Sequence, residues 1–145
     1  MRICLVSHSF YPATCYGGPI FSTYELCKKL AKLGFKVYVS TTNANCNKSL
    51  KVKVNKFIKL EDNFFVKYYK EQITYYLSIS LILNLYKDIK NSDVIYIQYI
   101  FIIQFHLLFF SWIFNKRIII CPRASLSPWG LKWKGFYQNI LRNYG

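Results

Sequence analysis

Apolar and polar positions along the chain form strand-like runs that alternate with helix-like periods. Residues 2–7 are a short apolar run, which predicts a buried strand, and the glycine- and proline-rich stretch 8–19 predicts a loop. Over 20–34 the apolar residues recur at steps of three and four, as on one face of a helix, and 37–42 read as a second strand. Residues 2–42 therefore predict a βαβ unit with two parallel strands.

The same alternation continues to the end of the chain. It predicts strands at 52–60, 61–69, 93–98 and 117–121, helices at 72–89, 104–114 and 131–144, and loops at 43–50 and 122–128. A chain of 145 residues is long enough for one domain with a core and too short for two ordinary ones. The pattern predicts a single Rossmann-like α/β domain over 1–145, a mostly parallel sheet with helices on both faces.

The run from Val94 to Phe114 carries no charge and, at 21 residues, is long enough to cross a bilayer. Gln98, Gln104 and His106 interrupt it, and its first residues are β-branched and aromatic, as in a buried parallel strand. We interpret the run as strand, loop and buried helix, with a membrane span as the alternative.

The net charge of +14, from 20 basic against 6 acidic residues, attracts anionic partners. The lysines are spread from Lys28 to Lys134 without a recognition motif, so nucleic acid is not predicted as a partner. The basic and aromatic segment 131–144 could lie on an anionic membrane surface or pack on the sheet. The abundance of Lys together with Asn, Ile, Tyr and Phe also fits a bias in coding on a solvated surface.

The five cysteines have no pairwise metal-ligand or C-x-x-C spacing; they are Cys4, Cys15, Cys27, Cys46 and Cys121. Their odd number and scattered positions predict reduced thiols in a cytoplasmic protein, with Cys4, Cys27 and Cys121 buried as small apolar residues. The apolar start of the chain is too short for the core of a signal peptide.

Candidate binding residues follow predicted strands, at the sheet edge where ligands of open α/β folds bind. Gly17 and Gly18 precede a helix, so their backbone can approach a phosphate or carboxylate. His8 follows the first strand, and Arg123 follows a later one with a forked, permanent charge suited to the same anions. The structural alternatives are a simple turn, a polar loop residue and a salt bridge.

Three stretches resemble the family 4 glycosyltransferases, which have the GT-B fold. Tyr16–Pro19 with Leu33–Val37 is similar to the family's double glycine, helix and following strand, and Asp93–Gln98 to a later strand. Pro122–Leu131 resembles the family's Pro-Arg-Gly-x-Leu-Ser-Pro-Trp segment and differs from it at Ala124. The third stretch is the most specific, and the three occur in the family's order.

The resemblance implies that the chain is the amino-terminal, acceptor-side half of a two-domain enzyme. The intact enzyme would transfer a sugar from a nucleotide-sugar donor to a hydroxyl acceptor, a sugar or a lipid-linked molecule, in surface polysaccharide synthesis. The carboxy-terminal donor domain is not among the 145 residues, so we expect the chain to be inactive alone. Two interpretations stay open: a truncated product, or one half of a split enzyme whose partner is a separate carboxy-terminal GT-B half. The resemblance implies no bound metal, and we expect no cofactor. The cysteine pattern and the basic segment 131–144 predict a place in the cytoplasm or at the inner face of the cell membrane.

The chain departs from the family at Tyr96 and Gln98, where relatives often have His-x-His and the second histidine is catalytic in some members. Glutamine has no titratable nitrogen and cannot act as a general base, although it can bond a sugar hydroxyl. The predicted substrate-binding residues are therefore Gly17, Gly18, Gln98, Arg123 and His8, with no catalytic residue assigned. The alternative function is a basic membrane-surface or partner-binding module without enzymatic activity.

Overall fold

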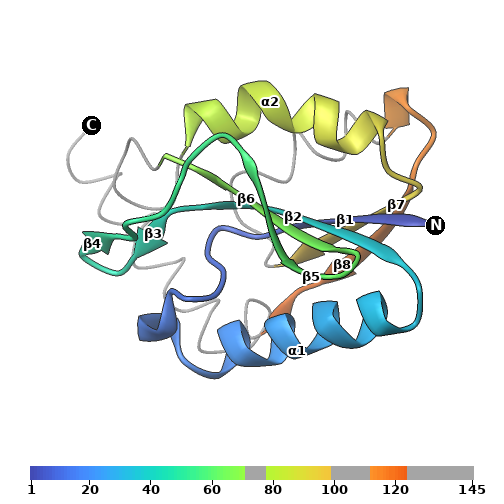
Figure 1. The fold of residues 1–145 in the computed structure, drawn as a ribbon. Helices are drawn as coiled ribbons and strands as arrows, with labels where there is room; N and C mark the ends of the chain where they lie inside the picture. Colours follow the sequence, from blue (N-terminus) through green and yellow to red (C-terminus); the bar gives the residue numbers. More distant parts are fainter. Residues whose placement is uncertain (71–77, 99–111, 124–145) are drawn as a thin grey trace.

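The computed structural model describes residues 1–70, 78–98 and 112–123 (Figure 1). The strands of these residues are β1 (Arg2–Val6), β2 (Lys36–Thr42), β3 (Ala44–Asn45), β4 (Lys48–Ser49), β5 (Phe57–Glu61), β6 (Phe64–Tyr69), β7 (Val94–Gln98) and β8 (Arg117–Cys121). The helices are η1 (Thr14–Tyr16), a 3-10 turn, and α1 (Gly18–Lys32) and α2 (Ile79–Lys90). The predicted helix at 131–144, most of that at 104–114 and the start of that at 72–89 lie outside the described residues.

Six of the described strands form one sheet in the order β5-β6-β2-β1-β7-β8. Strand β1 pairs in parallel with β2 on one side and with β7 on the other, and β2–β6 and β7–β8 are also parallel. Only β5, on β6, is antiparallel among these pairs. The predicted βαβ unit of residues 2–42 and the mostly parallel α/β fold are confirmed.

The two long helices lie on opposite faces of this sheet (Figure 1). Leu81, Leu85 and Ile89 of α2 are buried against residues of β1 and β7, at the i,i+4 spacing predicted from the sequence. On the other face, Cys27 and Ala31 of α1 pack with residues of β1, β2 and β6. Strands β1 and β7 are covered on both faces, which explains why they read as nearly continuous apolar runs.

Helix α1 ends at Lys32, two residues before Gly34, which is the last position of the predicted helical period. The Gly34 N–H donates to the Ala31 carbonyl (3.0 Å) and the Phe35 N–H to the Leu30 carbonyl (3.2 Å). This is the Schellman pattern, which needs a left-handed residue after the last helical turn, and Gly34 has φ +89°. The turn directs the chain into β2 beside β1.

The predicted polar loop at 43–50 contains a small two-stranded sheet, β3–β4, directly after β2. Its strands are two residues long and carry no apolar alternation, so no sequence pattern marks them. The strand predicted at 52–60 begins only at Phe57; the residues before it contribute Val52 and Val54 to the core.

A charged cluster lies between α2 and the sheet. The Asp88 carboxylate accepts hydrogen bonds from Ser40 Oγ (2.8 Å) and Tyr69 OH (2.7 Å), and Lys67 Nζ lies 3.6 Å from its other oxygen. The side chains of Lys67 and Asp88 are only 14% and 6% exposed. Buried charges need such partners, so this cluster holds α2 to β2 and β6 at a defined register.

In the described part of the chain, no helix combines the length and the apolar character needed to cross a bilayer. The uncharged run at 94–114 begins as strand β7, as interpreted from its β-branched residues. Residues 99–111 of that run lie outside the described residues.

Candidate functional site at the carboxyl edge of the sheet

The parallel strands β1, β7 and β8 end at one edge of the sheet, and the residues predicted to bind substrate follow them. His8 comes after β1, Gln98 is the last residue of β7, and Arg123 follows β8. Helix α1 begins near the same edge, because the loop after β1 leads into it.

Gln98 and Arg123 meet at a residue that the sequence analysis did not select, Thr23 of α1. Arg123 Nη2 donates to Thr23 Oγ1 (2.9 Å), and Thr23 Oγ1 lies 2.8 Å from Gln98 Oε1 and 2.7 Å from the Pro19 carbonyl oxygen. Thr23 and Gln98 are almost fully buried. We call Thr23, Gln98 and Arg123 the edge cluster; it joins three segments that are distant in sequence.

Arg123 is the charged member of the edge cluster and is half-buried. Its Nε is buried and has no hydrogen-bond partner among the described residues. A buried donor without a partner is costly, and for a guanidinium the natural partner is a carboxylate or phosphate. Arg123 also has φ +50°, a left-handed conformation that non-glycine residues seldom adopt and that is enriched at functional sites.

Gly17 and Gly18 start the helix that carries Thr23. Gly17 is the N-cap with φ +74°, a conformation that favours glycine, and a Cβ placed on either glycine would meet no atom within 4 Å. The helix start is a weak anion cradle, however, because Pro19 has no N–H and the Ile20 N–H bonds the Gly17 carbonyl (3.1 Å). The glycines leave room for a ligand, and Arg123 supplies the charge.

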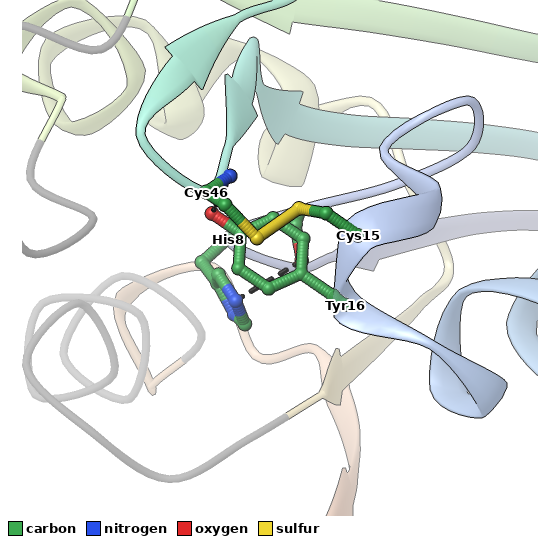
Figure 2. Close-up of a disulfide and its surroundings, with 5 residues drawn as sticks. His8, Cys15, Tyr16 and Cys46 are labelled. Atoms are coloured by element: carbon green, nitrogen blue, oxygen red, sulfur yellow. Dashed lines mark hydrogen bonds between the residues drawn. A yellow bond between two sulfur atoms is a disulfide. The ribbon is translucent and has the colours of Figure 1, made fainter.

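His8 lies against its own loop. Ser9 Oγ is 3.0 Å from His8 Nε2, and the Tyr16 ring meets the imidazole edge to face, with ring centroids 5.4 Å apart (Figure 2). Burial lowers the pKa of His8 from 6.5 to about 4, so the ring is neutral at pH 7. So weak a base is poorly matched to general-base catalysis at neutral pH.

Tyr96 and Gln98, which the sequence resemblance aligns with a His-x-His pair, differ in their surroundings. Gln98 is in the edge cluster, whereas Tyr96 is half-buried on β7, and burial followed by a hydrogen bond with Cys121 raises the pKa of Tyr96 to about 12. The phenol therefore stays protonated at neutral pH. Tyr96 and Gln98 can bond hydroxyl groups but cannot accept a proton as a base.

The prediction that the cysteines are all reduced is wrong for Cys15 and Cys46, which form a disulfide (Figure 2). Cys15 is in η1, after β1, and Cys46 is in the β3–β4 turn, after β2; because β1 and β2 are parallel neighbours, both segments lie at one sheet edge. Their Cα atoms are 6.2 Å apart although 31 positions separate them in sequence. Cys4 and Cys27 are reduced and buried as predicted, and Cys121 is reduced but only half-buried.

Thr23 carries a signal that sequence reasoning could have used. It lies between Ile20 and Cys27 on the face of α1 that the helical period assigns to the core. A polar residue on a core face needs a buried partner, which is here Gln98. Among the described residues, no group of three or more His, Cys, Asp or Glu side chains could hold a metal ion.

No protein-family model and no curated protein sequence matches this chain. Among solved structures, the chain is similar to sucrose-phosphate synthase from Thermosynechococcus elongatus, with a TM-score of 0.47 and 14% sequence identity. The match covers 82% of this chain and 32% of that one, so the chain spans about a third of that structure's length.

Proposed function

We propose that the chain is the acceptor-side domain of a glycosyltransferase that moves a sugar from a nucleotide-sugar donor to a hydroxyl acceptor in surface polysaccharide synthesis. The edge cluster is the observation that carries this proposal. It places at the carboxyl edge of the sheet a guanidinium that Thr23 and Gln98 hold in position and whose Nε has no partner among the described residues. The ordered motifs at Tyr16–Pro19, Asp93–Gln98 and Pro122–Leu131 support the same assignment.

In this proposal each residue of the edge has a distinct role. Arg123 pairs with an anionic group of the bound molecule through Nε, while Nη2 keeps its bond to Thr23. Thr23 and Gln98 are almost fully buried and hold the Arg123 guanidinium in position, and Gly17 and Gly18 allow the ligand to approach the backbone. The described edge holds no base matched to neutral pH, since His8 has a pKa of about 4. We therefore propose that the chain binds acceptor without turning over donor by itself.

A binding titration tests the site. Glucose 1-phosphate is the probe, since it carries both hydroxyls and a phosphate, and isothermal calorimetry or NMR gives its affinity. Arg123→Gln keeps a donor for Thr23 but removes the charge, and we expect it to weaken binding by about 10- to 100-fold, the loss of one charge-assisted contact. Arg117→Gln, at the exposed opposite end of β8, is the matched control and should bind as the wild type does. Equal affinities in all three proteins, or no binding to the wild type, contradict the proposed site.

A turnover assay tests the inactivity. The chain is incubated with UDP-, GDP- and dTDP-sugars, with and without glucosides as acceptors, and released nucleotide is measured. We expect release at the rate of the buffer blank. Robust turnover by this chain alone would contradict the acceptor-side assignment.

The second candidate function, a module that binds an anionic membrane surface, is favoured by the outer face of α2. Ile79, Leu83 and Tyr86 recur there at helical spacing and are exposed, Leu83 to 64%. Lys87 and Lys90 follow in the last turn, with Lys87 Nζ over the Tyr86 ring at 5.6 Å. Exposed apolar side chains beside basic ones are typical of helices that lie on anionic lipid.

Vesicle sedimentation separates this candidate from the first. The membrane candidate predicts salt-sensitive binding to phosphatidylglycerol vesicles and little binding to phosphatidylcholine vesicles. It also predicts that Leu83→Gln loses the binding to phosphatidylglycerol. Leu33→Gln changes an apolar residue of similar exposure (74%) after α1, on the other side of the sheet, and should have no effect. Equal losses in both variants, or no binding by the wild type, reject the membrane function.

A further inference from the structure

The Cys15–Cys46 disulfide joins the loop that precedes α1 to the hairpin that follows β2 (Figure 2). Cys15 is two positions before Gly17, the N-cap of α1. A second link between the same segments is the hydrogen bond from the Cys46 N–H to Tyr16 OH, at 3.0 Å. We call residues 13–18, which contain Gly17 and Gly18, the glycine loop. The disulfide is the covalent part of a small contact that holds this loop in place.

This disulfide is accessible, whereas two of the remaining thiols are not. Cys15 and Cys46 are both exposed, while Cys4 and Cys27 are fully buried. Burial also raises the pKa of the Cys4 and Cys27 thiols to about 12, so neither forms the thiolate that attacks a disulfide. A small reductant in solution can therefore reach the Cys15–Cys46 disulfide, and the buried thiols of Cys4 and Cys27 do not exchange with it.

The glycine loop depends on this contact. Tyr16 makes two contacts here: its OH accepts a hydrogen bond from the Cys46 N–H of the hairpin, and its ring packs on His8, which follows β1. The next residue, Gly17, has φ +74° and sets the start of the helix that carries Thr23. Gly17 and Gly18 have large conformational freedom when they are not held, so loss of the covalent link favours other loop conformations.

We infer that Cys15–Cys46 is a thiol–disulfide switch that controls the order of the glycine loop and, if the proposed function is right, the affinity of the edge site. In the oxidised chain the loop is held against the β3–β4 hairpin. A dithiol reductant transfers two electrons and two protons to the disulfide, giving two cysteine thiols, and itself becomes a disulfide. In the reduced chain the two segments are joined by noncovalent contacts such as the Cys46 N–H to Tyr16 OH bond, which break when the loop opens, so the loop opens more often.

The first test counts thiols in the full chain. Denatured without reductant and alkylated, the oxidised protein should show three modified cysteines, Cys4, Cys27 and Cys121, and all five after dithiothreitol. Five modified cysteines in protein treated with oxidised glutathione would overturn the inference, because the pair would then not form.

The second test measures loop order by hydrogen exchange. We expect amides of residues 13–18 and 44–49 to exchange at least about 10-fold faster after reduction, with the amides of β1 and β2 unchanged. Cys121→Ser should keep this response, and Cys15→Ser/Cys46→Ser should exchange rapidly with or without dithiothreitol. Unchanged exchange in the reduced wild type overturns the switch, and since that arm needs no substitution, a folding defect of the double variant cannot obscure it.

The third test separates the switch from the proposed function. Glucose 1-phosphate should bind the oxidised chain several-fold more tightly than the reduced chain. If exchange responds to reduction but neither state binds, the control of affinity is rejected together with the proposed function, while the control of loop order stands. If both states bind equally, the control of affinity is rejected and the site stands.

Discussion

Removal of the Asp88 carboxylate should lower the free energy of unfolding more than removal of an exposed carboxylate does. In Asp88→Ala, Ser40 and Tyr69 lose the acceptor that lies 2.8 and 2.7 Å away, and Lys67 loses its carboxylate partner. Breaking a buried ion pair from one side costs about 3–5 kcal/mol, because the other charge stays buried. Lys67 Nζ also lies over the rings of Phe57 (5.1 Å) and Tyr69 (4.8 Å). These cation–π contacts partly stabilise the Lys67 charge once its carboxylate partner is removed. We therefore expect a loss of about 3 kcal/mol.

Urea unfolding followed by circular dichroism measures this loss. With an m-value of about 2 kcal/mol/M, a loss of about 3 kcal/mol lowers the unfolding midpoint by roughly 1.5 M. Asp62→Ala breaks an ion pair with Lys59 in which the side chains are 93% and 58% exposed, and its midpoint should not change measurably. Lys67→Met/Asp88→Leu replaces the buried pair with apolar groups and should recover much of the loss.

Two results would refute this reasoning. Equal midpoints for Asp88→Ala and Asp62→Ala would mean that the Asp88 carboxylate is not buried among its partners. A double variant as unstable as the sum of Lys67→Met and Asp88→Leu measured singly would mean that the two charges do not interact.

The remaining predictions concern the loop after β1 and the start of α2. His8 has a lower pKa folded (about 4) than unfolded (6.5), so the unfolded chain binds more protons between these values and stability falls as pH falls through that window. Urea midpoints at pH 7 and 4.5 should differ less in His8→Gln than in the wild type, and equal differences would contradict the buried, neutral ring. Gly17→Ala should lower the free energy of unfolding by about 1 kcal/mol because Gly17 has φ +74°, whereas Gly18→Ala, in helical backbone, should leave it unchanged or raise it. Thermal melts in which Gly18→Ala is the less stable variant would exclude this loop geometry. Ser78→Ala removes the N-cap acceptor of the Leu81 N–H and should cost about 1 kcal/mol by the same melts; an unchanged melting temperature would show that the cap contributes nothing.

The parts of the fold that the sequence predicts are those whose burial follows a simple period. Strands β1 and β7 are short, buried apolar runs, and α1 and α2 have apolar residues at helical steps, so their positions follow from side-chain burial. Strand β8 is predicted by its run of three isoleucines, although most of its side chains are exposed or half-buried. The β3–β4 hairpin depends on backbone pairing between two-residue strands, and no side-chain pattern reports that.

The candidate site was predicted only in part, for a related reason. Gln98 is the last residue of β7 and Arg123 follows β8, so their place at one sheet edge can be deduced from parallel topology. Thr23, which links them, lies on a helix and is marked only as a polar residue on a core face. Distance along the chain conceals the Cys15–Cys46 pair, because their contact depends on which strands are neighbours.

The most direct test of the edge cluster observes the Arg123 Nε–H itself. In a spectrum of arginine Nε–H groups, glucose 1-phosphate should shift the Arg123 signal progressively as the phosphate becomes the partner that Nε lacks among the described residues. The Arg117 signal should not move, and Arg123→Gln should identify the shifted peak by its absence. An Arg123 signal that stays in place at saturating glucose 1-phosphate would contradict the assignment of this edge as the ligand site.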